Sequence, residues 1–86
     1  MWDVRFTRNA EKDKKLIKQA GMESKANKLL DVLATNPCQN PPSHEKLSGD
    51  LTGYYSRRIN IQHRLVYRID EDKHMVIVHA MWSHYE

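Results

Sequence analysis

The sequence lacks the cysteine pairs of disulfide-linked proteins and the long apolar runs of membrane proteins. Of its 86 residues, one is cysteine (Cys38), three are glycine and three are proline. A single cysteine cannot form an internal disulfide, and this usage is typical of reducing surroundings. No apolar run approaches the roughly 18 residues that a membrane span needs, and the N-terminal stretch lacks the apolar segment of a signal peptide. We therefore expect a cytosolic protein that does not enter membranes.

Several kinds of catalytic site also lack support. The cysteine and the histidines show no CxxC or HxxxH spacing, so we expect no metal site. The three glycines are isolated and cannot form a glycine-rich phosphate loop. No nucleophile elbow supports a serine hydrolase. The sequence therefore predicts no metal and no cofactor.

Length and composition indicate one small globular domain over residues 1–86. The chain is 40% hydrophobic and 29% charged. A chain of this size buries only about 60–65% of its unfolded surface, which leaves room for one core between two layers. The net charge is only +3, but four arginines fall within twelve residues: Arg57, Arg58, Arg64 and Arg68. Guanidinium groups bind phosphate through paired hydrogen bonds, so this cluster suggests a polyanionic partner.

The N-terminal half predicts one strand and two helices. Residues 2–6 alternate apolar and polar side chains, as a half-buried strand does. Apolar residues at three-four spacing then predict a helix that follows Thr7 as N-cap and ends at Gly21. We expect Leu16 to widen its apolar stripe. A second helix is predicted over residues 23–35.

The C-terminal half predicts a loop and three strands. Residues 36–50 contain all three prolines and predict an irregular loop, and loops of this length in compact domains are usually functional. Alternating patterns then predict antiparallel strands, with turns near residues 61–62 and 71–73. The fold class is therefore α+β, in the order β-α-α-β-β-β. Both helices should cover one face of a mainly antiparallel sheet and leave the other face open.

The strand pattern assigns the arginines to faces. If Leu65 and Tyr67 face the helices, Arg64 and Arg68 face the open side. Arg58 can share that face with Arg64 only if the hairpin between them has an odd number of residues or contains a bulge. Taken alone, these arginines are equally well interpreted as solvated strand charges.

Glu45, in the loop, and His84, near the end of the sequence, complete a set of groups suited to cutting RNA. Cleavage by the internal 2′-OH needs a base for the hydroxyl proton and an acid for the departing 5′-oxygen. It also needs cations to balance the extra charge of the transition state. Singly, a loop glutamate and a terminal histidine are ordinary surface groups. Their combination with strand arginines indicates a nuclease.

Two segments of the sequence resemble the YoeB/Txe branch of the RelE-like toxins. One is EKL, then six intervening residues, then YYSRRINIQHRLVYRI, and the other is the closing AMWSHYE. The resemblance is specific over residues 45–85. It implies a RelE-like fold of the microbial-RNase type and the role of toxin in a type II toxin–antitoxin system. The implied activity is ribosome-dependent cleavage of mRNA, which inhibits translation. It also implies that Glu45 is the general base and His84 the general acid.

Other residues match the family pattern one by one. The resemblance implies that Arg64 stabilises the transition state, that Arg58 contacts phosphate, and that Tyr85 is the tyrosine beside the acid. A phosphate-contacting lysine of the family aligns with Ser48, and we expect the nearby Lys46 to take over its contact.

The resemblance also implies partners: the ribosome with its mRNA, and a cognate antitoxin of the YefM/Axe kind. Carboxylates offer arginine the same paired acceptors as phosphate, so we expect an acidic, partly helical C-terminal antitoxin segment across the loop 36–50 and the C-terminus. A homodimer is left open, because the first helix lacks the aromatic residues that are frequent in this branch.

Two other functions stay open at this point. One is a RelE-fold protein that binds a partner or nucleic acid without cutting, as a co-repressor does. The other is a ParE-like poison of gyrase. The combination of Glu45 with His84 favours the nuclease, because binding alone needs neither group.

Overall fold

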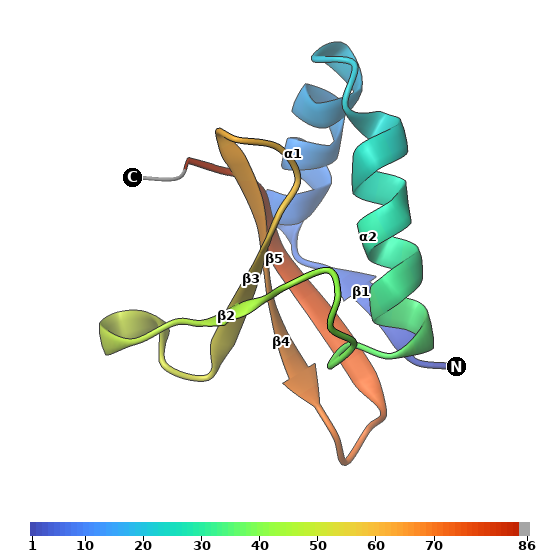
Figure 1. Cartoon of the computed structure of the whole chain (residues 1–86), viewed down its shortest axis with the longest axis vertical. Helices are drawn as coiled ribbons and strands as arrows, with labels where there is room; N and C mark the ends of the chain where they lie inside the picture. Colours follow the sequence, from blue (N-terminus) through green and yellow to red (C-terminus); the bar gives the residue numbers. More distant parts are fainter. Residues whose placement is uncertain (85–86) are drawn as a thin grey trace.

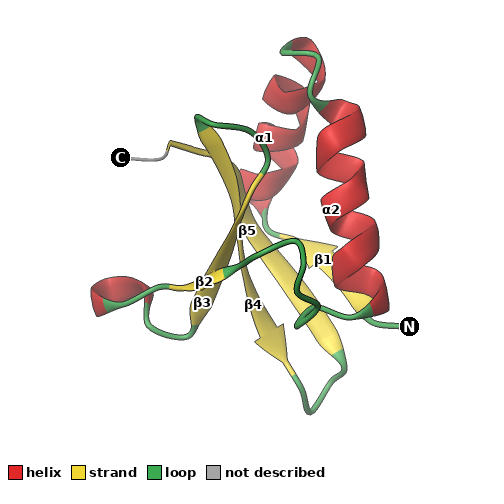
Figure 2. Cartoon of the chain, viewed as in Figure 1, coloured by secondary structure: helices red, strands yellow, loops and turns green. Residues whose placement is uncertain are grey.

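The computed structural model describes the backbone of residues 1–84 and the side chains of residues 1–83. Its elements are β1 (Asp3–Phe6), α1 (Arg8–Gln19), α2 (Glu23–Thr35), β2 (Glu45–Lys46), the 3₁₀ turn η1 (Gly49–Leu51), β3 (Tyr54–Arg58), β4 (His63–Asp70) and β5 (Met75–His84). Both helices lie on the same side of the sheet (Figures 1 and 2). No helix in this part of the chain is long and apolar enough to cross a membrane.

The sheet has five strands in the order β1-β5-β4-β3-β2. β1 runs parallel to β5, and the other neighbouring pairs are antiparallel. The predicted fold class and order of elements are confirmed, with one addition: the proline-containing loop forms the two-residue strand β2 at the edge of the sheet. This short strand matters because it begins with Glu45.

Local sequence signals account for the first helix. The side chain of Thr7 accepts a hydrogen bond from the backbone N–H of Ala10 at 3.2 Å, as an N-cap does. Gly21 follows the helix with a positive φ of 73°, a conformation that favours glycine. The expectation for Leu16 was wrong. Ala10 and Ile17 face the sheet and are buried, whereas Leu16 lies at the edge of that stripe and is 38% exposed.

The core lies between the helices and one face of the sheet. The helices and the turn between them contribute Ala10, Ile17, Met22, Ala26, Leu29 and Leu33, and the sheet side contributes Ile59, Leu65, Tyr67, Val76, Val78 and Met81. The predicted alternation in β4 is confirmed, because Leu65 and Tyr67 are fully buried while Arg68 is exposed. No described helix covers the opposite face, which we call the open face.

A buried carboxylate of α1 holds an irregular part of β5. Between Val78 and Ser83, β5 contains two more residues than the segment of β4 that pairs with it. Within this bulge, the backbone N–H groups of Met81 and Trp82 donate to Asp13 Oδ2 at 2.9 and 3.3 Å. The Asp13 side chain is buried where it meets the strand. It therefore helps to fix the register of the residues that follow the bulge.

Asp13→Ala should destabilise the fold, because it leaves the buried N–H of Met81 and the partly buried N–H of Trp82 without their acceptor. We expect the free energy of unfolding, measured by urea denaturation, to fall by about 2–4 kcal/mol. Asp31→Ala, at an exposed position of α2, should change it by about 0.5 kcal/mol or less. Equal effects of the two substitutions would show that the carboxylate does not stabilise the bulge.

Candidate functional site

The open face brings Glu45 together with two arginines. In the pairing of β2 with β3, Glu45 lies opposite Ser56. In the pairing of β3 with β4, Arg58 lies opposite Arg64. Ser56 and Arg58 are two residues apart in one strand, so they share a face. Glu45, Arg58 and Arg64 therefore occupy the same face on three adjacent strands.

The hairpin between β3 and β4 has the odd length that places Arg58 and Arg64 on the same face. Five residues separate Arg58 from Arg64, an odd number that keeps both on one face. Asn60 organises this turn, since its side-chain oxygen accepts from the backbone N–H groups of Gln62 at 2.8 Å and His63 at 2.7 Å. An asparagine that bonds to the backbone two residues ahead is a common way to close a tight turn.

The end of β5 runs beside Arg64. Ser83 pairs with Arg64, and the backbone of His84 pairs with His63. The predicted acid therefore belongs to the strand next to Arg64, one residue beyond the direct partner of that arginine. The side chain of His84 and the whole of Tyr85 lie outside the described residues, so their roles stay predictions.

The structure does not bring Lys46 to the same face. Lys46 lies opposite Tyr55, next to Glu45 in a two-residue strand. Consecutive strand residues point to opposite faces, and the ring of Tyr55 stacks on the buried Tyr67 on the helix side. The register therefore gives no support to Lys46 as a replacement for the family lysine. Ser48, the position of that lysine, is exposed before η1.

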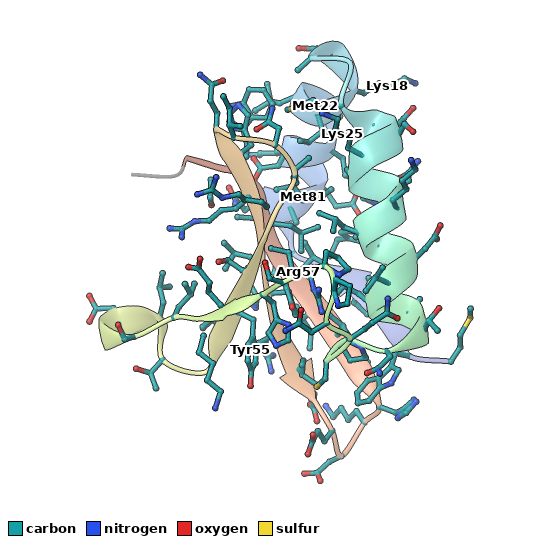
Figure 3. All side chains as sticks on the ribbon, in the orientation of Figure 1. Lys18, Met22, Lys25, Tyr55, Arg57 and Met81 are labelled. Atoms are coloured by element: carbon teal, nitrogen blue, oxygen red, sulfur yellow. The ribbon has the colours of Figure 1, made fainter. Side chains whose placement is uncertain are left out.

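A buried arginine ties the loop before β2 to the sheet (Figure 3). Arg57 is only 1% exposed. Its Nε donates to the hydroxyl of Tyr67 at 2.9 Å, and its Nη2 donates to the carbonyl oxygens of Pro37 at 2.9 Å and Gln39 at 2.8 Å. Its Nη1 donates to the carbonyl oxygen of Pro42. One guanidinium thus binds three separate points of the loop.

The acceptors around Arg57 in these four bonds are all neutral. A buried charge is tolerated when its donors are satisfied in this way. The sequence pattern placed Arg57 in the arginine cluster expected to bind a polyanion, and for this arginine the expectation is wrong. Arg57 is buried on the helix side, whereas Arg58 belongs to the open face. The register could have shown that Arg57 faces the helices, since Arg57 pairs with the buried Leu65.

Aromatic rings extend this support toward β2. The ring of His44, the residue before Glu45, meets Tyr55 edge-to-face at 5.8 Å, and Tyr55 stacks on Tyr67 at 5.9 Å. Burial lowers the pKa of His44, the positive charge of Arg57 lowers it further, and a hydrogen bond with the Gln39 backbone opposes both. The lowered pKa favours a neutral His44 ring in this packed layer beside Arg57.

Burial also raises the pKa of the Tyr67 hydroxyl, although the charge of Arg57 and its hydrogen bond act in the opposite direction. The hydroxyl therefore stays neutral near neutral pH. It can accept the bond from Arg57 without forming an ion pair.

Comparison with known proteins assigns the family. The model of the YoeB-like toxin of bacterial type II toxin-antitoxin systems matches residues 5–85. The chain belongs to this family. It is 42% identical to Toxin YoeB of Streptomyces coelicolor over 76 residues, which are 88% of this chain and 81% of that protein. It is 33% identical to Toxin YoeB of Escherichia coli K12 over 75 residues, 87% and 80% of the two chains.

Solved structures agree with the assignment. A YoeB/ParE toxin from Agrobacterium tumefaciens superposes with a TM-score of 0.85 and 30% identity over 96% of this chain and 99% of that one. YoeB of Staphylococcus aureus, from a heterotetrameric YoeB-YefM complex, gives a TM-score of 0.80 and 36% identity over 99% of both chains. The predicted family is confirmed. In the described part of the chain, no three His, Cys, Asp or Glu side chains gather as metal ligands.

Arg57→Met should lower stability, because it keeps most of the side-chain volume and removes all four hydrogen bonds to the loop and Tyr67. We expect a loss of about 2–4 kcal/mol in the free energy of unfolding. Arg57→Lys should fall in between, since an ammonium keeps the charge but not the planar fork. Arg68→Met, at an exposed position of the neighbouring strand, is the matched control and should cost about 0.5 kcal/mol or less. If Arg57→Met unfolds at the same urea concentration as Arg68→Met, Arg57 does not tie the loop to the sheet.

Proposed function

We propose that this YoeB-family toxin is an endoribonuclease that cuts mRNA on the ribosome and thereby stops translation. One observation carries the proposal. A carboxylate, Glu45, shares one sheet face with Arg58 and Arg64 on the two adjacent strands, and the end of β5 pairs with the strand that carries Arg64. A phosphate held by the arginines would lie where the carboxylate reaches the neighbouring ribose.

The proposed reaction is an attack by the RNA on its own backbone. Glu45 takes the proton of a 2′-OH, and that oxygen attacks the adjacent phosphorus. The bond from phosphorus to the 5′-oxygen of the next nucleotide breaks, and protonated His84 supplies the proton that this oxygen needs. The products are a 2′,3′-cyclic phosphate and a 5′-hydroxyl. The reaction uses only side chains of the toxin, with no metal and no cofactor.

The arginines and Tyr85 complete the proposed site. Arg64 and Arg58 donate to the non-bridging phosphate oxygens, whose negative charge increases in the transition state. Tyr85 contacts the RNA beside the acid. Lys46 is left out, because its register partner Tyr55 belongs to the helix side of the sheet.

Glu45→Gln and His84→Gln should each abolish proton transfer while keeping the size of the side chain. We expect each to lower the cleavage rate of ribosome-bound mRNA by roughly 10²–10⁴-fold. Primer extension from the mRNA measures the rate, and circular dichroism checks the fold. Glu23→Gln, at an exposed position of α2, is the control and should cut normally.

Two results would count against this mechanism. Normal cleavage by Glu45→Gln would show that Glu45 is not the general base. Growth arrest by the wild-type toxin with unchanged mRNA ends would point instead to a binding protein or to another target.

We also propose that a cognate antitoxin blocks this site through an acidic segment. YoeB of Staphylococcus aureus has been solved both with YefM and as a dimer. On this chain, the segment would lie across the open face near the loop 36–44, with carboxylates on Arg58 and Arg64. We also expect it to displace His84 or Tyr85, because β5 ends at His84, one residue beyond the partner of Arg64.

Antitoxin binding should therefore depend on both arginines and on salt. Arg58→Ala and Arg64→Ala should each weaken binding about tenfold or more, measured by titration calorimetry. Affinity for the wild-type toxin should fall as sodium chloride is raised, because the outer charges are screened. Arg5→Ala is the control, since Arg5 already pairs with Asp3 at 2.8 Å. Unchanged affinity in both arginine variants would place the antitoxin elsewhere.

A further inference from the structure

The open face continues beyond the proposed catalytic groups. Cross-strand pairing arranges its residues in three rows: Arg58, Arg64 and Ser83; then Glu45, Ser56, Val66 and Ala80; then Tyr54, Arg68, Ile77 and Arg5. Successive rows are two residues apart in β3 and β4, a step of about 7 Å. The third row has no part in the reaction described above.

The middle row forms a low floor. Its residues in β3, β4 and β5 have short side chains, whereas the rows on both sides carry arginines or tyrosine. Ser56 is 1% exposed and Val66 6%. The Oγ of Ser56 has no hydrogen-bond partner within the described residues. Glu45 lies at the β2 end of this floor, so a strand of RNA above the floor would pass between the long side chains of the outer rows.

The third row contains the aromatic ring of Tyr54, which packs against His79. The ring of Tyr54 meets His79 edge-to-face at 4.7 Å, and Tyr54 as a whole is partly exposed. Nε2 of His79 is buried, with no hydrogen-bond partner in the described part of the chain. Burial lowers the pKa of His79, and the charge of Arg68 lowers it further, so the neutral ring is favoured.

The two arginines of this row differ in their surroundings. Arg5 pairs with Asp3 at 2.8 Å. Arg68 is exposed and forms no salt bridge with a described residue. Arg68 and Arg64 are four residues apart in β4, about 13 Å along the strand. This separation is too large for one phosphate group, so the two arginines would bind different phosphates of the same RNA.

We propose that Tyr54 and Arg68 bind a nucleotide that flanks the cleaved bond. The base stacks on the exposed part of Tyr54, the phosphate accepts hydrogen bonds from Arg68, and His79 positions the tyrosine ring. Such stacking requires an unpaired base, so the ligand is single-stranded RNA. The proposal rests on RNA cleavage as the proposed function, and it adds a second contact along the substrate.

Charge sets the end of this binding surface. The next row of the open face contains Asp70 and Asp3, and the following turn contains Glu71 and Asp72. Carboxylates repel phosphate, so the contact with RNA should extend from the arginines of the first row to Arg68 and no further.

The test measures binding of short single-stranded RNA oligomers of increasing length, with every 2′-OH methylated so that they cannot be cut. Fluorescence anisotropy should show a gain in affinity once an oligomer is long enough to reach from Arg64 to Arg68. Tyr54→Ala should remove this gain, a loss of roughly 5- to 150-fold, while Tyr54→Phe should keep it. Arg68→Ala should reduce the slope of log affinity against log salt by about 0.7. Arg5→Ala, in the same row, should leave both quantities unchanged.

The outcomes separate this proposal from the catalytic one. If Tyr54→Ala binds every oligomer as the wild type does, or if length brings no gain, the second contact does not exist. If Tyr54→Ala and Arg68→Ala weaken binding of the antitoxin but not of RNA, the third row binds the protein partner and the proposal is overturned. If the length-dependent gain is present but no variant of Glu45 alters cleavage, the RNA surface stands and the catalytic assignment fails.

Discussion

The guanidinium of Arg57 is the contact on which the rest of the site depends. A strand of two residues has few backbone hydrogen bonds of its own, so β2 cannot fix Glu45 unaided. Arg57 binds three carbonyl oxygens of the preceding loop and the hydroxyl of Tyr67. Its neighbour Arg58 points the other way, because strand residues alternate between faces. Of these two consecutive arginines, Arg57 therefore supports the loop and Arg58 belongs to the open face.

Asp13 has the corresponding role for the other half of the site. It accepts two backbone N–H groups in the bulge of β5, just before the strand reaches Ser83 and His84. Both supports are charged groups buried on the helix side of the sheet, whereas Glu45, Arg58 and Arg64 lie on the other side. A reactive face that is held from behind by satisfied hydrogen bonds keeps its geometry while staying accessible to substrate.

Much of this architecture was predictable, because it follows from local rules. Thr7 and Gly21 mark the two ends of the first helix by capping. The alternation of apolar and polar residues in β4 assigned Arg64 and Arg68 to the open face. The position of Lys46 depended on strand β2, which the pattern of a proline-containing loop does not reveal. The role of Arg57 depended on the path of that loop, since its partners are backbone carbonyls with no signature in the sequence. The Asp13 contact likewise requires the packing of a helix on a bulge.

The central claim is that the open face promotes attack by a 2′-OH on the neighbouring phosphate. The most direct measurement is cleavage of ribosome-bound mRNA in which the single 2′-OH at the cut position is replaced by hydrogen. We expect this RNA to bind but not to be cut at that position, while unmodified RNA yields a 2′,3′-cyclic phosphate. Cleavage of the 2′-deoxy RNA at the normal rate would contradict it.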